Sequence, residues 1–238
     1  MLQKKKIKIG WCLDAQEHLL IYDDPKKLVP LKDNSINKKG YLSCPAVRAY
    51  CEDTYFVTSP FSLKIRFEDF KDSFEIKPVY PFTSIDENKF KEFITVEHPS
   101  TWRNNNTLTM QIPSPYVFFS DEDVSLEQSH SLLLNQSKMN WRVIPGKFNI
   151  YAWQRPLNWA FEWDVSLGDF EVKSGEPIYS LKFLSNKKKN CEFELKKYEM
   201  NEKILNRLKL TKNITSVKKG ISPLIEKAKK DRKKTNLM

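Results

Sequence analysis

Metal binding is the first chemistry that the residue types of this sequence could support. Its three histidines are His18, His98 and His130. Glu127 and His130 stand three residues apart, a spacing that on a helix places a carboxylate and an imidazole on one face. Together with His98 they could form the two-histidine, one-carboxylate ligand set of a non-haem iron site. The HxD or HxE spacing usual in such sites is absent, so ordinary surface histidines are the alternative interpretation.

A cluster of tryptophans with an arginine beside them is the second candidate site. Arg155, Trp153, Trp159 and Trp163 could hold a ligand, because indole rings and guanidinium groups stack on bases and sugars. However, Trp159, Phe161 and Trp163 are spaced by two, so on a strand they line one face. In a β-rich protein such a face commonly belongs to the core. A ligand platform and a core wall therefore remain alternatives.

The net charge of +10 resides in the C-terminal part of the chain. From residue 186 onward, 17 lysines and arginines stand against 6 acidic residues, whereas residues 1–185 carry 23 against 24. Such a basic tail could bind the phosphates of a nucleic acid, or it could be a solvated helix. The candidate nucleic-acid residues are Lys218, Lys219, Lys229, Lys230, Arg232, Lys233 and Lys234.

Nucleophilic and nucleotide chemistry is not predicted by any motif. The sequence has no GxSxG elbow, no glycine-rich phosphate motif and only six glycines. Cys12, Cys44, Cys51 and Cys191 include no CxxC pair, and we interpret them as reduced thiols of a cytoplasmic protein. We therefore expect no catalytic residue and no cofactor. No apolar run is long enough to cross a bilayer, so no membrane partner is expected.

The elements that must position these residues are mostly strands. Strands are predicted in "KIKIGW", "TYFVTS" and "FSLKIRF", at an edge within residues 74–82, and within 107–120, 141–163 and 157–183. Pro145 and Gly146 are expected to form a turn. Residues 84–96 could form a short helix with Ser84 as its N-cap. Residues 120–135 are expected to be a loop or a short acidic helix start.

Regular strand spacing with proline and glycine between the strands predicts an all-β fold of sandwich, jelly-roll or open-barrel type. This domain is expected to span residues 1–185. A basic, partly helical C-terminal extension is expected over residues 186–238, with Ser222 and Pro223 opening its second helix.

Several stretches carry a resemblance to a known group of proteins. "IPGKFNIYAWQRPLNWAFEW", "FEVKSGEPIYSLKF", "CPAVRAYCEDTYFVTSPFSLKIRF" and "QIPSPYVFF" resemble uncharacterised proteins of tailed marine phages over roughly residues 40–185. This resemblance implies no activity. The unit ending in "GEPIYSLKF" is also similar to the last strands of dUTPase-type β folds. The uridine-binding and catalytic aspartate motifs of that family are missing here, which argues against dUTP hydrolysis.

These observations favour a non-enzymatic accessory or assembly protein of phage type. It would act through a protein partner or self-assembly, with weak non-specific nucleic-acid binding by its tail. We expect it in the host cytoplasm or in a virion. The alternative is a β-barrel metalloenzyme, or an enzyme that binds a small ligand.

Overall fold

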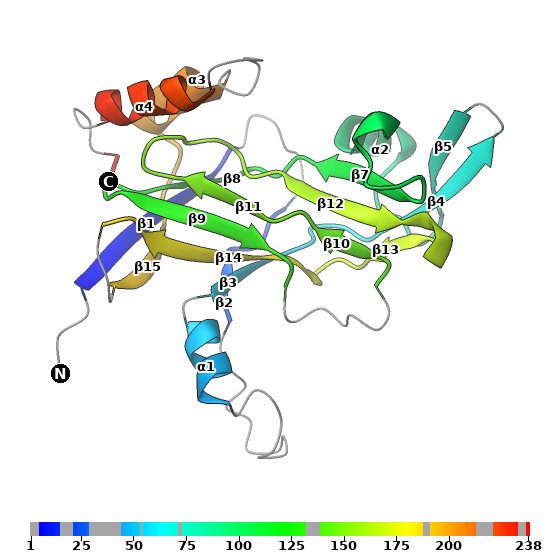
Figure 1. Ribbon diagram of the computed structural model, residues 1–238, viewed down its shortest axis with the longest axis horizontal. Helices are drawn as coiled ribbons and strands as arrows, with labels where there is room; N and C mark the ends of the chain where they lie inside the picture. The colour runs from blue at the N-terminus through cyan, green and yellow to red at the C-terminus, as the bar shows by residue number, and fades with distance from the viewer. Residues whose placement is uncertain are drawn as a thin grey trace.

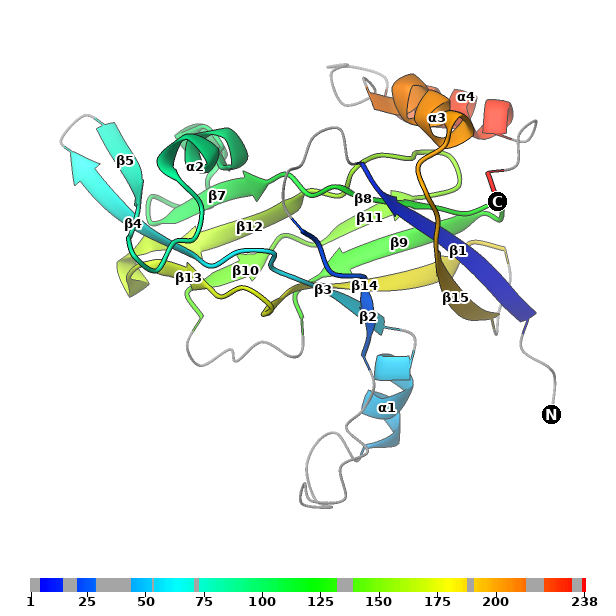
Figure 2. The same ribbon diagram turned by 180° about the vertical axis from the view of Figure 1, so that it is seen from behind.

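The computed structural model describes residues 5–14, 21–28, 44–52, 54–70, 73–131, 139–187, 191–212, 221–232 and 237–238. The fold is mainly β, and its strands form four hydrogen-bonded sheets in these ranges. The predicted all-β class is therefore confirmed. In both views, α2 and the β4–β5 hairpin lie at one end of the molecule, and α3 and α4 lie at the other (Figures 1 and 2).

Two of the sheets are linked by the segment from β7 to β8. The four-stranded sheet has the order β10-β12-β7-β6, built from β6 (Thr95–Val96), β7 (Thr107–Ile112), β10 (Trp141–Val143) and β12 (Trp159–Asp164). After a proline-containing break, as predicted, β8 (Tyr116–Phe119) enters the sheet β15-β1-β8 with β1 (Lys5–Leu13) and β15 (Cys191–Lys197). β15 runs parallel to β1. The domain division at residue 185 stays a prediction.

The other two sheets are connected to each other at two points of the chain. The five-stranded sheet β11-β9-β14-β3-β2 contains β2 (Lys26–Lys27), β3 (Thr54–Thr58), β9 (Val124–Ser129), β11 (Gly146–Asn149) and β14 (Pro177–Ser185). The three-stranded sheet β13-β4-β5 contains β4 (Leu63–Phe70), β5 (Ser73–Pro78) and β13 (Phe170–Val172). β3 leads into β4, and β13 leads into β14. β5 is an edge strand, as its prolines predict.

Aromatic side chains from these sheets fill the main core. Trp159, Phe161 and Trp163 are at most 1% exposed, and the Trp159 and Phe161 rings lie 4.7 Å apart. The alternating large residues of β12 therefore form part of the core, because every second side chain of a strand points to the same face. Trp159 and Trp163 have no exposed face to offer a ligand.

The segment 120–135 differs from its prediction. Instead of a loop or helix start, it contains β9, which pairs with β11 on one side and β14 on the other. Residues 132–138 lie outside the described ranges. Pro145 and Gly146 do not close a hairpin either, because β10 pairs with β12 whereas β11 pairs with β9. The chain changes sheets there.

The helices are α1 (Pro45–Glu52), α2 (Glu87–Phe93), α3 (Glu202–Lys212) and α4 (Ile221–Arg232), with short 3₁₀ helices at Pro99–Thr101 and Val165–Leu167. The N-cap of α2 is Asp86, whose side chain accepts a hydrogen bond from Lys89 N. The predicted cap Ser84 is instead engaged with Ser62. α4 begins one residue before Ser222. Within the described residues, no helix is long and apolar enough to span a membrane.

α3 docks on the body through a second, smaller core. Ile204 and Leu208 pack with Cys12, Val117 and Phe119. At the end of the chain, the backbone N–H groups of residues 237 and 238 donate to the carboxylate of Asp121. The C-terminal extension is therefore held against β1 and β8.

The four cysteines are free, as predicted. Cys12 and Cys51 are buried, Cys44 is exposed and Cys191 is half-buried. Burial raises the pKa of the Cys12 thiol to about 12, so this side chain stays a neutral thiol at physiological pH.

Candidate functional site

The predicted metal ligands do not form a cluster. His98 caps the Pro99–Thr101 helix, and Glu127 pairs with Lys147 at 3.2 Å. The helical spacing assumed for Glu127 and His130 is wrong, because β9 is a strand and residues three apart on a strand point to opposite faces. Among the residues that the structure describes, no group of three His, Cys, Asp or Glu side chains could hold a metal ion.

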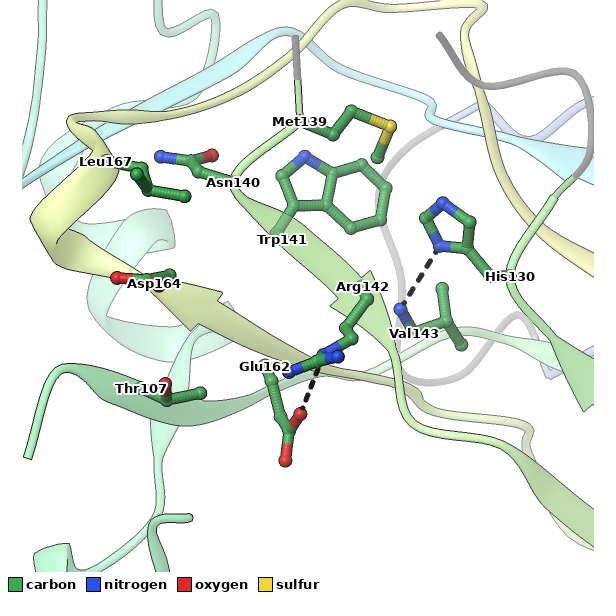
Figure 3. Close-up of a pocket in the computed structure, with 10 residues that line it drawn as sticks. All are labelled: Thr107, His130, Met139, Asn140, Trp141, Arg142, Val143, Glu162, Asp164 and Leu167. Carbon is green, nitrogen blue, oxygen red and sulfur yellow. Dashed lines mark hydrogen bonds and ion pairs between the residues drawn. The ribbon is translucent and has the colours of Figure 1, made fainter. Parts of the chain in front are cut away.

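His130 lies in a pocket of about 440 Å³ at the β10 edge of the four-stranded sheet (Figure 3). Its Nδ1 accepts a hydrogen bond from Val143 N at 3.4 Å, and its ring meets Trp141 edge-on at 5.7 Å. Burial lowers the pKa of His130, so the neutral form that can accept this bond is favoured. The lining residues are Thr107, His130, Met139, Asn140, Trp141, Arg142, Val143, Glu162, Asp164 and Leu167.

Glu162 organises the charged side of this pocket. It lies on the outer face of β12, opposite the core face, and its side chain is only 10% exposed. Arg103 Nε donates to one of its carboxylate oxygens and Arg142 Nε donates to the other, each at 3.0 Å. Asp164 is engaged by the backbone N–H and hydroxyl of Ser166. The pocket therefore balances its charges internally, which favours a structural role.

The structure brings two members of the predicted tryptophan site together. The guanidinium of Arg155 lies over the ring of Trp153, 5.2 Å from its centroid. Arg155 Nε donates to the carbonyl of Pro156 at 3.2 Å. Burial lowers the pKa of Arg155. Trp153 Nε1 is itself buried and has no hydrogen-bond partner among the described residues.

The loop that carries this pair is fixed from within and from α3. Gln154 is fully buried, and its Nε2 donates to Ile150 O at 2.7 Å and to Tyr151 O at 2.8 Å. Arg207 Nε donates to Gln154 Oε1 at 3.1 Å, and the hydroxyl of Thr211 donates to the Gln154 carbonyl. The residue that precedes Arg155 is therefore held in place by its own loop and by α3.

Most of the predicted nucleic-acid residues lie outside the described residues. Lys218, Lys219, Lys233 and Lys234 fall outside the described residues, and Arg232 is the last residue of α4. Lys229 pairs with Glu226 at 2.9 Å, and Lys230 is exposed on the same helix.

Sequence reasoning did not find a groove of about 600 Å³ between β5 and α2. Its apolar lining comes from Phe74, Ile76 and Pro78 on β5, Phe90 on α2, and Ile94 and Val96 beyond the helix. The prolines of residues 74–82 signalled the edge strand and residues 84–96 signalled the helix, but nothing in the sequence signalled that the two lie side by side. Sequence reasoning also did not find Arg103 and Glu162, which lie 59 positions apart.

No family model matches this sequence, and no curated protein matches it either. What the chain does therefore has to be inferred from its own residues.

Proposed function

We propose that this chain is a non-catalytic accessory or assembly protein that works through protein contacts. Its contact would be with a second copy of itself, through the outer edge of β5. The observation that supports this proposal is an edge strand with which no other described strand pairs on its outer side. Its charges are self-complementary, and its outer side borders an apolar groove.

The backbone of β5 offers hydrogen bonds in the outward direction. Val79 N donates to Lys64 O at 2.9 Å, which makes residues 64 and 79 a hydrogen-bonded pair. Bonding alternates along an antiparallel ladder, so the backbone groups of Phe74 and Ile76 point away from β4. No strand of the described chain pairs with this edge. Unpaired edges are templates for another strand.

The groove beside β5 fits an added strand with alternating apolar residues. Phe74 and Ile76 share one face of β5, and the Phe74 ring meets Trp102 at 5.1 Å. Paired residues of antiparallel strands point to the same face. The corresponding side chains of a second β5 would therefore lie over the groove, against Phe90 and Ile94 of the first copy.

Charge selects one register of this pairing. With Ile76 opposite Ile76 of the second copy, Glu75 lies opposite Lys77 and Lys77 lies opposite Glu75. Both side chains are about half exposed. Within one chain Lys77 pairs with Glu75 at 3.3 Å and with Glu68 at 2.6 Å, and in the dimer the Glu75–Lys77 pairing would extend across the two strands. The register shifted by one residue pair would place Glu75 against Glu75, which is destabilising. Cross-strand pairs of opposite charge stabilise a sheet by roughly 0.2–1 kcal/mol each.

Lysine and proline on an edge strand commonly discourage pairing, but here they suit it. In the favoured register, Pro78 lies opposite Phe74 and only has to accept a hydrogen bond from the Phe74 N–H. Lys77 finds a carboxylate rather than an apolar neighbour. The residues that protect the strand from other partners thus favour its own copy.

The test is the concentration dependence of the mass in solution, measured by sedimentation equilibrium. We expect the native chain to form dimers and Glu75→Lys to weaken them at least tenfold, because the substitution places like charges opposite each other. The double variant Glu75→Lys/Lys77→Glu restores opposite charges and is expected to restore the dimer.

Glu171→Lys serves as the matched control. It changes an exposed glutamate on β13, the opposite edge of the same sheet, and is expected to leave dimerisation unchanged. A monomer at all concentrations would overturn the proposal. So would a dimer that the single substitution does not weaken.

The phage resemblance fits an assembly role and remains a prediction, as does location in the host cytoplasm or a virion. The metalloenzyme alternative is not favoured, because the described residues hold no three-ligand cluster.

A further inference from the structure

Arg155 carries a charge that the described protein does not neutralise. The residue is half-buried, and within the described residues it forms one hydrogen bond, from Nε to the Pro156 carbonyl. Burial lowers its pKa, and no carboxylate of the described residues counteracts that effect. Burying a charge is costly unless it is paired. The missing counter-charge points to a ligand.

The orientation of the guanidinium leaves its binding edge available. The guanidinium carbon lies over the indole of Trp153, 5.2 Å from its centroid, and Nε is occupied. The two Nη groups remain, and they form the fork that binds two oxygens of one oxyanion side by side. Stacking on Trp153 also limits the motion of the side chain, so little conformational entropy is lost when an anion binds.

The surroundings favour an anion with more than one charge. The residue before Arg155 is bonded to α3, and Arg207 Nη2 joins α3 to the Ala228 carbonyl of α4. Together, α3 and α4 carry eight basic residues against three acidic ones in the sequence. A positive field of this kind raises the local concentration of anions.

We propose that the Nη edge of Arg155, held by Trp153 beside the basic helices α3 and α4, is a binding site for a phosphate group. The phosphate could belong to a small ligand or to a nucleic-acid backbone, because both present the same pair of oxygens. β5 lies at the end of the molecule opposite α3 and α4 (Figure 1), so the site does not depend on β5.

The test is titration of the full-length protein with inorganic phosphate at constant ionic strength, followed by tryptophan fluorescence and calorimetry. We expect saturable binding to the native chain, binding at least tenfold weaker to Arg155→Lys, and no binding to Arg155→Gln. Lysine keeps the charge but loses the fork. Arg142→Gln is the matched control, because it removes an arginine that already has a carboxylate, and it should bind like the native chain.

The source of the phosphate is then identified with a nucleoside monophosphate and a single-stranded oligonucleotide. A nucleic-acid site should bind the oligonucleotide more tightly, with a salt dependence that Arg155→Gln reduces by about one phosphate contact. A small-ligand site should show no such preference. If the native chain shows no saturable response to phosphate, or Arg155→Gln responds equally, the proposal is wrong. Dimerisation by sedimentation is a separate readout, so failure of one proposal leaves the other standing.

Discussion

Arg142 and Arg155 differ in exposure and in pairing. The more exposed arginine has a carboxylate partner, whereas the more buried one has none among the described residues. The Arg142 side chain is 62% exposed and still has a carboxylate at 3.0 Å. Arg155 is half-buried and contacts a carbonyl and an indole ring, but no carboxylate in the part of the chain that the structure describes. Water alone could solvate the first charge, whereas the second needs a partner. A half-buried charge that lacks a partner indicates a binding site better than the number of charges in a pocket does.

Arg207 shows that this chain can satisfy a buried guanidinium when its role is structural. It is 6% exposed and donates to Gln154 Oε1, Ala152 O and Ala228 O at 2.6–3.3 Å. These bonds join α3, α4 and the loop that carries Arg155. The open donors of Arg155 are therefore not a general feature of the arginines in this region.

We expect the largest loss of stability when Arg207 is replaced. Arg207→Met removes donors from buried acceptors, and we expect the free energy of unfolding to fall by about 2–3 kcal/mol. Chemical denaturation followed by circular dichroism measures this change. Arg207→Lys should lose less, because it keeps the charge and one bond. Lys203→Met, on the exposed side of α3, is the control. Equal stability of Arg207→Met and the control would show that the buried bonds do not hold the extension in place.

A smaller effect is expected where the arginines are exposed. Glu162→Gln removes the charge between Arg103 and Arg142 but keeps the size and an acceptor oxygen. Because both arginines can return to water, we expect a loss of about 1 kcal/mol. That loss should shrink at high salt, since salt screens exposed pairs. Denaturation at low and high salt measures both effects. A loss as large as that of Arg207→Met would show that the pair is coupled to the core.

Much of the fold could be predicted because strand side chains alternate. Leu63 and Ile65 are fully buried, as the period of two predicts. β9 was missed because its buried positions include polar residues. Ser125 and Gln128 are inside because Asn186 Oδ1 and the Asn158 carbonyl accept their hydrogen bonds. These hydrogen-bond acceptors are far away in the sequence and come close only in the folded chain, so a local pattern could not reveal them.

The candidate site shows the same limit. Trp153 and Arg155 are neighbours in sequence, so their pairing was within reach of sequence reasoning. The spacing of Trp159 and Trp163 predicted that they share a face, but only the packing of the sheets decides whether that face is core or surface. The groove of β5 depends on how α2 settles beside an edge strand, and no local pattern encodes that.

The smallest change in stability is expected at Arg155 itself. Removing a structural ion pair lowers stability, whereas removing an unpaired, half-buried cation leaves it unchanged or raises it by up to about 1 kcal/mol, because the desolvation of the charge is relieved. Arg155→Gln in phosphate-free buffer should therefore unfold at the same denaturant concentration as the native chain, or slightly later. Adding phosphate should then stabilise the native chain but not the variant, because a ligand that binds only the folded state shifts the unfolding equilibrium. A loss of more than 1 kcal/mol without phosphate would mean that stacking on Trp153 is the structural purpose of Arg155, and the contrast with Arg142 would disappear.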